Sequence, residues 1–320
     1  MHAVFLDIDT VDRNDLDLAP LRATLPDWTL HPNTLPEEVV ERIADAEVII
    51  TNKVVLNREH ILQAPRLKLI CAAATGTNNI DSAAAAERGI PVCNARDYAT
   101  DSVVQHVFAL LLTLVTRLDA YRNDIRTGRW SRSDQFCLLD HPIQTLAGMH
   151  LGLVGSGVLG QATARIATSF GMQVTFARSL RANGSEDHSG RPPLDALLPQ
   201  VDVLSLHCPL TPATRHLINA QRLERMPPGS LLLNTARGGL VDPQALADAL
   251  RGGHLAGAGI DVLDPEPPPA DHPLLAPDIP NLVLTPHTAW AARQARQNVL
   301  CEIEANIRAF LAGHPRNVVM

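Results

Sequence analysis

The 320-residue sequence has few cysteines and no excess of positive charge. Its five cysteines are odd in number and widely spaced, and no Cys-x-x-Cys is present. This pattern argues against a disulfide framework or a zinc site and favours a reducing compartment. The formal net charge of −7 argues against nucleic acid or an anionic membrane as a partner. We therefore expect no bound metal, no nucleic acid and no disulfide.

Long hydrophobic runs are also missing. The longest, "VFALLLTLV", is interrupted by Thr113 and is shorter than a membrane-spanning helix. The amino-terminal apolar run has four residues before Asp7 and lacks the basic region and cleavage site of a signal peptide. The sequence thus predicts a cytoplasmic protein without a membrane partner.

Short apolar runs and helical patterns alternate along the chain in two series. The first series covers about a hundred residues and includes "AVFLDI", "AEVIIT", "KLICAA" and "IPVCNA"; the second begins at "MHLGLVGSG". This rhythm predicts an α/β fold with two parallel-sheet domains. Residues 101–118 are too apolar for a surface helix, so we expect a hinge helix between the domains. Residues 126–148 lack periodicity, which predicts a segment that covers a site or embraces a second subunit.

A glycine-rich turn opens the second series. Gly155, Gly157 and Gly160 form G-x-G-x-x-G directly after a predicted strand and at the start of a predicted helix. The first glycine permits a tight turn, the second admits a pyrophosphate and the third allows the helix to pack closely on the strand. We predict a dinucleotide site over residues 155–160, which also include Ser156, Val158 and Leu159; an ordinary glycine turn is the alternative.

Arg178 stands 23 residues after Gly155, where dinucleotide-binding folds often place an acidic residue that binds the adenosine ribose. A guanidinium cannot accept hydrogen bonds from a ribose hydroxyl, but it pairs well with a 2′-phosphate. Ser179 and Arg181 add a hydroxyl and a further positive charge. We therefore favour NADP(H), with NAD(H) as the alternative cofactor. Arg178 as a solvated surface residue is the other interpretation.

Three ionisable residues follow predicted strands of the same half: Arg237, Glu266 and His287. In open α/β sheets, ligands bind beyond the carboxyl ends of the strands, so the three side chains can converge. An imidazole can donate a proton as a general acid, so His287 is a candidate for that role, and Glu266 can orient its ring. Arg237 can bind the substrate carboxylate and polarise the carbonyl. Taken singly, such an arginine is often a surface residue and such a histidine a core residue.

Several phrases carry a resemblance that covers nearly the whole chain: "ATGTNNID", "GLVGSGVLG", "HCPLTPAT", "NTARGGLVD", "GAGIDVLDPEP" and "PHTAW". With them the sequence resembles the D-isomer-specific 2-hydroxyacid dehydrogenases. The phrases "TNKVVL", "GRWSRSDQFCLLDHPI" and "PHTAWAA" are most similar to the glycerate dehydrogenase and hydroxypyruvate (glyoxylate) reductase branch. The resemblance implies reversible reduction of a short 2-oxo acid, hydroxypyruvate or glyoxylate, to the D-2-hydroxy acid.

The resemblance also implies two Rossmann-like domains with a cleft between them, the first flavodoxin-like. We place the substrate domain at residues 1–97 plus 288–320 and the dinucleotide-binding domain at 98–287. Residues 126–148 would form an arm that holds a homodimer together. The implied catalytic residues are Arg237, Glu266 and His287; substrate binding would add Lys53, Thr75, Gly76 and Trp290, and cofactor binding His207, Cys208, Pro209, Thr214, Thr235, Ala236 and Asp261.

Other interpretations stay open. Seven prolines between Asp264 and Pro280 predict a stiff loop that holds Glu266, although prolines also cap surface loops. The same scaffold could serve a nicotinamide-sensing corepressor, or a dehydrogenase for another 2-hydroxy acid. A formate dehydrogenase is disfavoured, because such relatives replace the carboxylate beside the histidine by an amide and this chain has Glu266.

Overall fold

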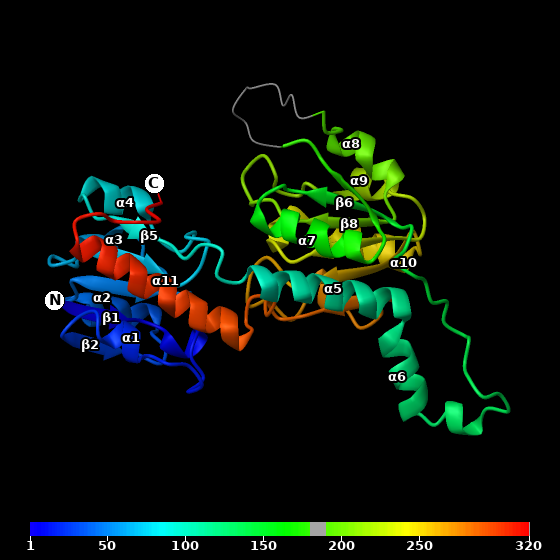
Figure 1. Cartoon of the computed structure of the whole chain (residues 1–320), viewed down its shortest axis with the longest axis horizontal. Helices are drawn as coiled ribbons and strands as arrows, with labels where there is room; N and C mark the ends of the chain where they lie inside the picture. The colour runs from blue at the N-terminus through cyan, green and yellow to red at the C-terminus, as the bar shows by residue number, and fades with distance from the viewer. Residues whose placement is uncertain (180–189, 320) are drawn as a thin grey trace. The chain divides into compact units, whose positions relative to one another are not determined.

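The chain divides into two compact units in a computed structural model that describes residues 1–179 and 190–319. Unit 1 comprises Met1–Thr100 and Trp290–Met320, and unit 2 comprises Asp101–Ala289. Each unit contains one sheet whose strands all pair in parallel (Figure 1). The predicted α/β class with two parallel sheets is confirmed.

The sheet of unit 1 has five strands in the order β2-β1-β3-β4-β5. Their bounds are β1 His2–Phe5, β2 Asp27–Leu30, β3 Val48–Thr51, β4 Leu69–Ala72 and β5 Val92–Cys93. Strand β2 lies at the edge and was not expected from the sequence. Its sequence, DWTL, is partly exposed throughout, so it lacks the apolar run that marks a buried strand.

Both faces of this sheet are buried. Phe5, Ile50 and Cys71 point to one face and pack with Val299 and Ile303 of the last helix. Their sequence neighbours in the same strands point to the other face and join a second core beneath helices α2 to α4. Since alternate residues of a strand face opposite sides, a sheet covered on both sides needs a continuous apolar run. That requirement explains runs such as "VIIT".

Short helices connect these strands, and one long helix closes unit 1. They are α1 Ala19–Arg22, α2 Val39–Ile43, α3 Arg58–Leu62, α4 Ser82–Glu87 and α11 Arg293–Leu311. After α11 the chain returns to the sheet, where Val318 forms an antiparallel bridge with Cys93. Unit 1 is therefore completed by residues from both ends of the chain (Figure 1).

The sheet of unit 2 has six strands in the order β11-β10-β9-β8-β6-β7. Their bounds are β6 His150–Val154, β7 Gln173–Phe176, β8 Val203–Leu206, β9 Ser230–Asn234, β10 Leu255–Ile260 and β11 Leu282–Leu284. The first strand, β6, lies between the second and the third. The chain therefore winds in opposite directions on either side of β6 and β8, which makes this pair the topological switch point.

The helices of unit 2 are α5 Thr100–Thr116, α6 Leu118–Arg126, α7 Val158–Ser169, α8 Leu194–Leu197, α9 Ala220–Arg225 and α10 Pro243–Arg251. Single 3₁₀ turns occur at Ile8–Thr10, Pro36–Glu38, Trp130–Arg132, Leu198–Gln200, Gly238–Leu240 and Pro273–Leu275. Helix α10 has a well-defined start: Asp242 caps it by accepting from the amides of Gln244 and Ala245, and proline holds the first position.

Helix α5 packs directly on the sheet of unit 2. A Cβ added to Gly257 or Gly259 of β10 would lie 2.8 Å from Leu114 or Leu110 of α5, so these glycines let the helix approach. The expected single helix over 101–118 is wrong at its end. Arg117 is left-handed, with φ at 54°, and it separates α5 from α6. No single helix in the described residues is long and apolar enough to cross a membrane. The pair α5 and α6 reaches that length and hydrophobicity only when the two are taken together, and they are bent by 61°.

Candidate active site

The predicted cofactor and catalytic residues of unit 2 follow the carboxyl ends of its strands. Gly155 follows β6, His207 follows β8, and Thr235 to Arg237 follow β9. Asp261 and His287 follow β10 and β11. All six strands are parallel, so their carboxyl ends share one edge of the sheet. Ligands of open α/β sheets bind at that edge, next to the switch point.

The three glycines of the turn after β6 differ in their surroundings. Gly155 has φ at 107°, and a Cβ there would lie 2.6 Å from the backbone of His207. A Cβ on Gly160 would lie 2.1 Å from the carbonyl oxygen of Gly155. Nothing lies within 4 Å of a Cβ built on Gly157. The outer two glycines therefore hold the turn together, whereas the middle one faces open space that a pyrophosphate could occupy.

The segment after β8 forms the other side of the switch point. The ring of His207 accepts or donates one hydrogen bond through Nε2, at 2.9 Å from Ser205 Oγ, while its buried Nδ1 has no partner in the described residues. Burial lowers the pKa of His207 to about 4, so the ring is neutral at pH 7. Burial also raises the pKa of the Cys208 thiol to about 11, which keeps it protonated. Thr214 Oγ1 donates to the carbonyl of Pro209 at 2.8 Å and closes this loop.

The residues after β7 lie beside the glycine turn. Arg178 is exposed, and its amide donates to the carbonyl of Pro192 at 2.8 Å. Arg191, which the sequence analysis did not single out, donates through Nη1 to Ser156 Oγ at 2.6 Å. No motif marks Arg191, because it is 13 residues from Arg178 and reaches the site only through the fold. Ser179 belongs to the same segment, and Arg181 lies outside the described residues.

Glu266 and His287 are joined directly. His287 Nδ1 lies 2.6 Å from Glu266 Oε2, and Glu266 Oε1 accepts from the amide of Leu263 at 2.9 Å. His287 has φ at 54°, a left-handed conformation that is uncommon for residues other than glycine. The surrounding loop must therefore hold the histidine in place. The carboxylate fixes the ring and leaves Nε2 as the nitrogen that can reach a substrate.

Asp261 supplies much of that support. Its carboxylate is 1% exposed and accepts from the amides of Thr288 and Ala289, each at 2.9 Å. It also accepts from Thr285 Oγ1 at 2.5 Å and lies 3.4 Å from His106 Nε2. Burial acts to raise the pKa of Asp261, but these hydrogen bonds together outweigh burial and hold it below the usual value. Asp261 therefore anchors the loop that carries His287.

Helix α5 contributes to the same loop. His106 Nε2 lies 2.9 Å from Thr285 Oγ1, and Ser102 Oγ donates to the carbonyl of Ala289 at 2.6 Å. Both residues lie in the segment 101–118, for which the sequence predicts only a helix. Neither residue has a motif of its own, because each acts through a contact with a distant part of the chain.

The turn that carries Arg237 touches the loop that carries Glu266. A Cβ on Gly238 would lie 2.1 Å from the backbone of Leu263, so only glycine fits there. Arg237 Nη1 donates to the carbonyl of Ala236 at 2.6 Å, and Asn234 Nδ2 donates to the carbonyl of Arg237 at 2.9 Å. The turn that carries Arg237 and the loop that carries Glu266 are thus in contact.

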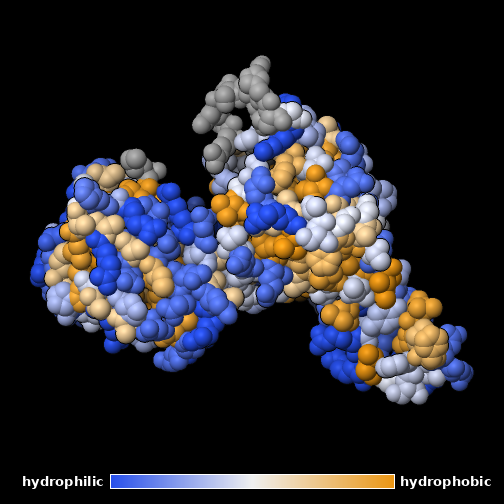
Figure 2. Space-filling model, in the orientation of Figure 1, coloured by the Kyte–Doolittle hydropathy of each residue, from blue (hydrophilic) through white to orange (hydrophobic). Residues whose placement is uncertain are grey.

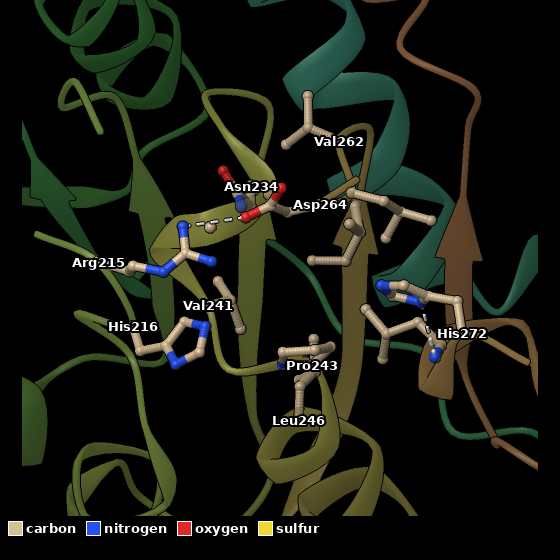
Figure 3. Close-up of a pocket in the computed structure, with 14 residues that line it drawn as sticks. Arg215, His216, Asn234, Val241, Pro243, Leu246, Val262, Asp264 and His272 are labelled. Carbon is tan, nitrogen blue, oxygen red and sulfur yellow. Dashed lines mark hydrogen bonds and ion pairs between the residues drawn. The ribbon is translucent and has the colours of Figure 1, made fainter. Parts of the chain in front are cut away.

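A cavity of about 110 Å³ lies behind this contact (Figure 3). Arg215 and Asp264 both line it and form an ion pair, with Arg215 Nη1 3.2 Å from Asp264 Oδ2. His216, His272, Asn234, two glycines and apolar side chains complete the lining, which includes none of the three predicted catalytic residues. In the described residues no group of three or more His, Cys, Asp or Glu side chains is arranged to hold a metal ion.

The predicted substrate residues of unit 1 also follow strand ends. Lys53 lies beyond β3, while Thr75 and Gly76 lie beyond its neighbour β4. Asp7, after β1, accepts from the amides of Asn52, Lys53 and Val54, and burial raises its pKa although these hydrogen bonds act the other way. This buried aspartate was not identified from the sequence.

The loop of Thr75 has its own supports. Asn94 Nδ2 donates to the carbonyl of Thr75 at 2.7 Å, and Thr75 Oγ1 donates to the carbonyl of Ala95 at 3.0 Å. Trp290 packs edge to face against Tyr98, with ring centroids 6.4 Å apart.

Comparison with known proteins agrees with this arrangement. The family model described as "D-isomer specific 2-hydroxyacid dehydrogenase, NAD binding domain" matches residues 108–289, more than half of the chain. A glycerate dehydrogenase of Methylorubrum extorquens is 42% identical over 311 residues, which are 97% of each chain. A hydroxypyruvate reductase of Blautia hydrogenotrophica is 37% identical over 323 residues, covering 100% of this chain and 99% of the relative.

Solved structures show the same fold with either nicotinamide cofactor. An acyclic imino acid reductase in complex with NADPH and D-Arg superposes with a TM-score of 0.87 at 26% identity, covering 100% of both chains. A D-lactate dehydrogenase from Aquifex aeolicus, complexed with NAD and lactic acid, gives a TM-score of 0.80 at 29% identity and covers 98% of this chain and 96% of its own.

The glycine turn yields a first prediction. Gly157→Ala should leave the melting temperature nearly unchanged, because its Cβ meets nothing in the protein, but it should weaken dinucleotide binding about tenfold or more. Gly160→Ala, the matched control, should instead destabilise unit 2 by about 1–3 kcal/mol, because its Cβ overlaps a backbone oxygen. Thermal unfolding and calorimetric titration with NADPH measure the two effects. Unchanged NADPH affinity in Gly157→Ala would show that the open space is not the cofactor site.

Proposed function

Because this chain belongs to the D-isomer-specific 2-hydroxyacid dehydrogenase family, we propose that it reduces hydroxypyruvate or glyoxylate to the D-2-hydroxy acid with NADPH as the preferred donor. The direct pairing of Glu266 with His287 at the sheet edge is the observation that carries the proposal. The glycerate dehydrogenase and hydroxypyruvate reductase relatives support the choice of a short, hydroxylated or unsubstituted 2-oxo acid.

The reaction needs a hydride at the carbonyl carbon and a proton at the carbonyl oxygen. A bound reduced nicotinamide supplies the hydride. His287 gives the proton from Nε2 as the oxygen becomes negative, and the carboxylate of Glu266 stabilises the cationic ring before transfer. In the oxidation direction the neutral ring takes the proton back. Both oxygens of the Glu266 carboxylate are engaged, one by the ring of His287 and the other by the amide of Leu263.

Arg237 is assigned to the substrate carboxylate. A guanidinium binds a carboxylate through two parallel hydrogen bonds and polarises the adjacent carbonyl. In the structure its Nη1 is satisfied by the carbonyl of Ala236, so binding of substrate would exchange this neutral partner for a charged one. Lys53 and the amides at Thr75 and Gly76 are proposed as further carboxylate ligands, and Trp290 as a wall of the substrate pocket.

The proposed cofactor contacts follow the strand ends of unit 2. Residues 155–160 would hold the pyrophosphate at the positive end of α7, and His207 to Pro209, Thr214, Thr235 and Ala236 would line the same edge. Asp261 was expected to orient the nicotinamide carboxamide. Its carboxylate already accepts from Thr285, Thr288 and Ala289, so we propose that it acts mainly by holding the His287 loop.

NADPH is favoured because Arg178 replaces an acidic residue at the end of β7. The related structures bind NADPH in one case and NAD in the other, so the choice rests on this chain's own residues. Arg178 is exposed and does not pack in the core, so its guanidinium is accessible to a charged ligand.

We also propose that the arm at residues 126–148 joins two copies of the chain. Phe136 is 91% exposed and Leu139 is 80% exposed, and Trp130 and Ile143 add further apolar surface (Figure 2). Large apolar side chains exposed together on an irregular segment are typical of a protein interface. Tyr121 and Asp124 of α6 fasten the arm through hydrogen bonds with His141, and Arg129 and Asp140 pair within the arm.

The catalytic assignment predicts a loss of turnover without a loss of cofactor binding. His287→Ala should lower kcat by roughly 10²- to 10⁴-fold, since general acid catalysis contributes about that much. Glu266→Gln keeps the shape but not the charge and should lower kcat by a smaller factor. His314→Ala, an exposed histidine near the end of the chain, is the control. Steady-state kinetics with hydroxypyruvate and calorimetric NADPH binding provide the readouts; near-normal rates in His287→Ala would remove it from the mechanism.

The substrate and cofactor are tested with one kinetic matrix: hydroxypyruvate, glyoxylate, pyruvate and phenylpyruvate, each with NADPH and NADH. We expect the highest kcat/KM for hydroxypyruvate or glyoxylate with NADPH. Arg178→Asp should reduce kcat/KM with NADPH far more than with NADH, because the carboxylate repels a 2′-phosphate and accepts from a ribose hydroxyl. Arg165→Asp, an exposed change on α7, controls for net charge. Equal losses with both cofactors would refute the assignment of Arg178.

The arm predicts a dimer in solution. Light scattering should give about twice the 34.6 kDa of one chain. Replacing Phe136 and Leu139 together by serine should shift the population toward monomer, whereas Leu62→Ser, an equally simple change at an exposed leucine of unit 1, should not. A monomeric wild-type protein at micromolar concentration would contradict the proposed arm.

A further inference from the structure

Arg191 is held beside the glycine turn by two contacts that lie far apart in sequence. Its Nη1 donates to Ser156 Oγ, the side chain between the first two glycines, at 2.6 Å. Its guanidinium carbon also lies 5.4 Å from the centre of the Phe176 ring, at the end of β7. A guanidinium over an aromatic face is attracted to the ring, and the planar group is thereby oriented. Arg191 is thus pre-positioned at the junction of the glycine turn and the end of β7.

Arg178 and Arg191 belong to two segments that are fastened to each other. The amide of Arg178 donates to the carbonyl of Pro192 at 2.8 Å, and Arg178 Nε approaches the carbonyl of Arg191 at 3.4 Å. The backbone positions of the two arginines are therefore fixed relative to each other. The two side chains start from neighbouring backbone segments, next to the strand end where dinucleotide-binding folds hold the adenosine ribose.

The local charge favours an anion. Helix α7 begins at Val158, two residues after Ser156, and its first turn has no acidic residue. Its positive end therefore adds to the two guanidinium groups rather than being offset by a carboxylate. A phosphate dianion is stabilised most by several charge-assisted hydrogen bonds from differently placed donors. One exposed arginine at Arg178 would supply only part of such a site.

We infer that Arg191 is a second specificity-determining residue, which together with Arg178 binds the 2′-phosphate of NADP(H). The inference rests on the proposed preference for NADPH. In the proposed site, Arg178 binds the 2′-phosphate from the exposed side. Arg191 binds it from the side of the glycine turn and is held in place by Phe176. Ser156 Oγ holds Arg191 before binding and is the natural third donor when the phosphate is present.

A structural role makes a different prediction. If Arg191 only fastens Ser156 and the glycine turn, its removal disturbs every adenine nucleotide equally, because all of them use the same turn. If it binds the 2′-phosphate, only ligands that carry this group lose affinity. The two roles are separated by the ratio of two affinities, and this ratio does not depend on turnover.

The experiment is isothermal titration of the full-length protein with 2′,5′-ADP and with 5′-AMP, which differ only in the 2′-phosphate. We expect the wild-type protein to prefer 2′,5′-ADP. Arg191→Ala should weaken 2′,5′-ADP binding roughly 10- to 100-fold, as for loss of hydrogen bonds to a charged group, and should change 5′-AMP binding less than about twofold. Arg191→Lys should restore part of the affinity, because it keeps the charge but not the planar fork.

Arg165→Ala serves as the matched control, since it removes one exposed positive charge from α7 two turns beyond its start. It should leave the affinity ratio unchanged. An equal loss for both ligands in Arg191→Ala, or an unchanged ratio while Arg178→Ala abolishes the preference, would overturn the inference and leave the NADPH proposal intact. A wild-type protein with no preference for 2′,5′-ADP would instead refute the NADPH proposal itself.

Discussion

Parallel strand pairing is the constraint on which the candidate active site depends. All six strands of unit 2 run in the same direction, so every loop after a strand leaves the sheet at one edge. Gly155, Arg237, Glu266 and His287 come from four such loops, spread over more than a hundred residues of sequence. The order of the strands then puts the glycine turn next to His207, because β6 and β8 are neighbours. Parallel pairing therefore brings residues that are distant in sequence to the same edge of the sheet.

Close backbone approach is the second requirement. The turn after β6 works because Gly155 lies against the backbone of His207 and Gly160 lies against Gly155. The loops of Arg237 and Glu266 meet because Gly238 lies against Leu263. At each point a methyl group would force two chain segments apart. These glycines therefore support the site through close packing, whereas Gly157 of the same turn faces open space.

Each unit also uses one buried aspartate to hold a loop. Asp261 accepts from the amides beyond His287, and Asp7 accepts from the amides around Lys53. A buried carboxylate is stable only when hydrogen bonds satisfy it, so each of these loops is tied to the interior by a group that is costly to disturb. The His287 loop needs such support most, because a residue other than glycine seldom adopts the left-handed conformation that His287 has here. Helix α5 adds to it through Ser102 and His106.

Local sequence determined the class of fold, most strand positions and the family, because these depend on residue periodicity and on short motifs that span a few neighbouring residues. It missed β2, whose partly exposed edge position leaves no apolar run, and it extended the hinge helix past the left-handed Arg117. Arg191, Asp7 and Ser102 carry no motif; each acquires its contact only when strands and helices from distant parts of the chain are packed together. The sequence therefore decided which chemical groups are present and on which elements they lie, and the tertiary structure decided which of them meet, because hydrogen bonds and close packing depend on distance in space.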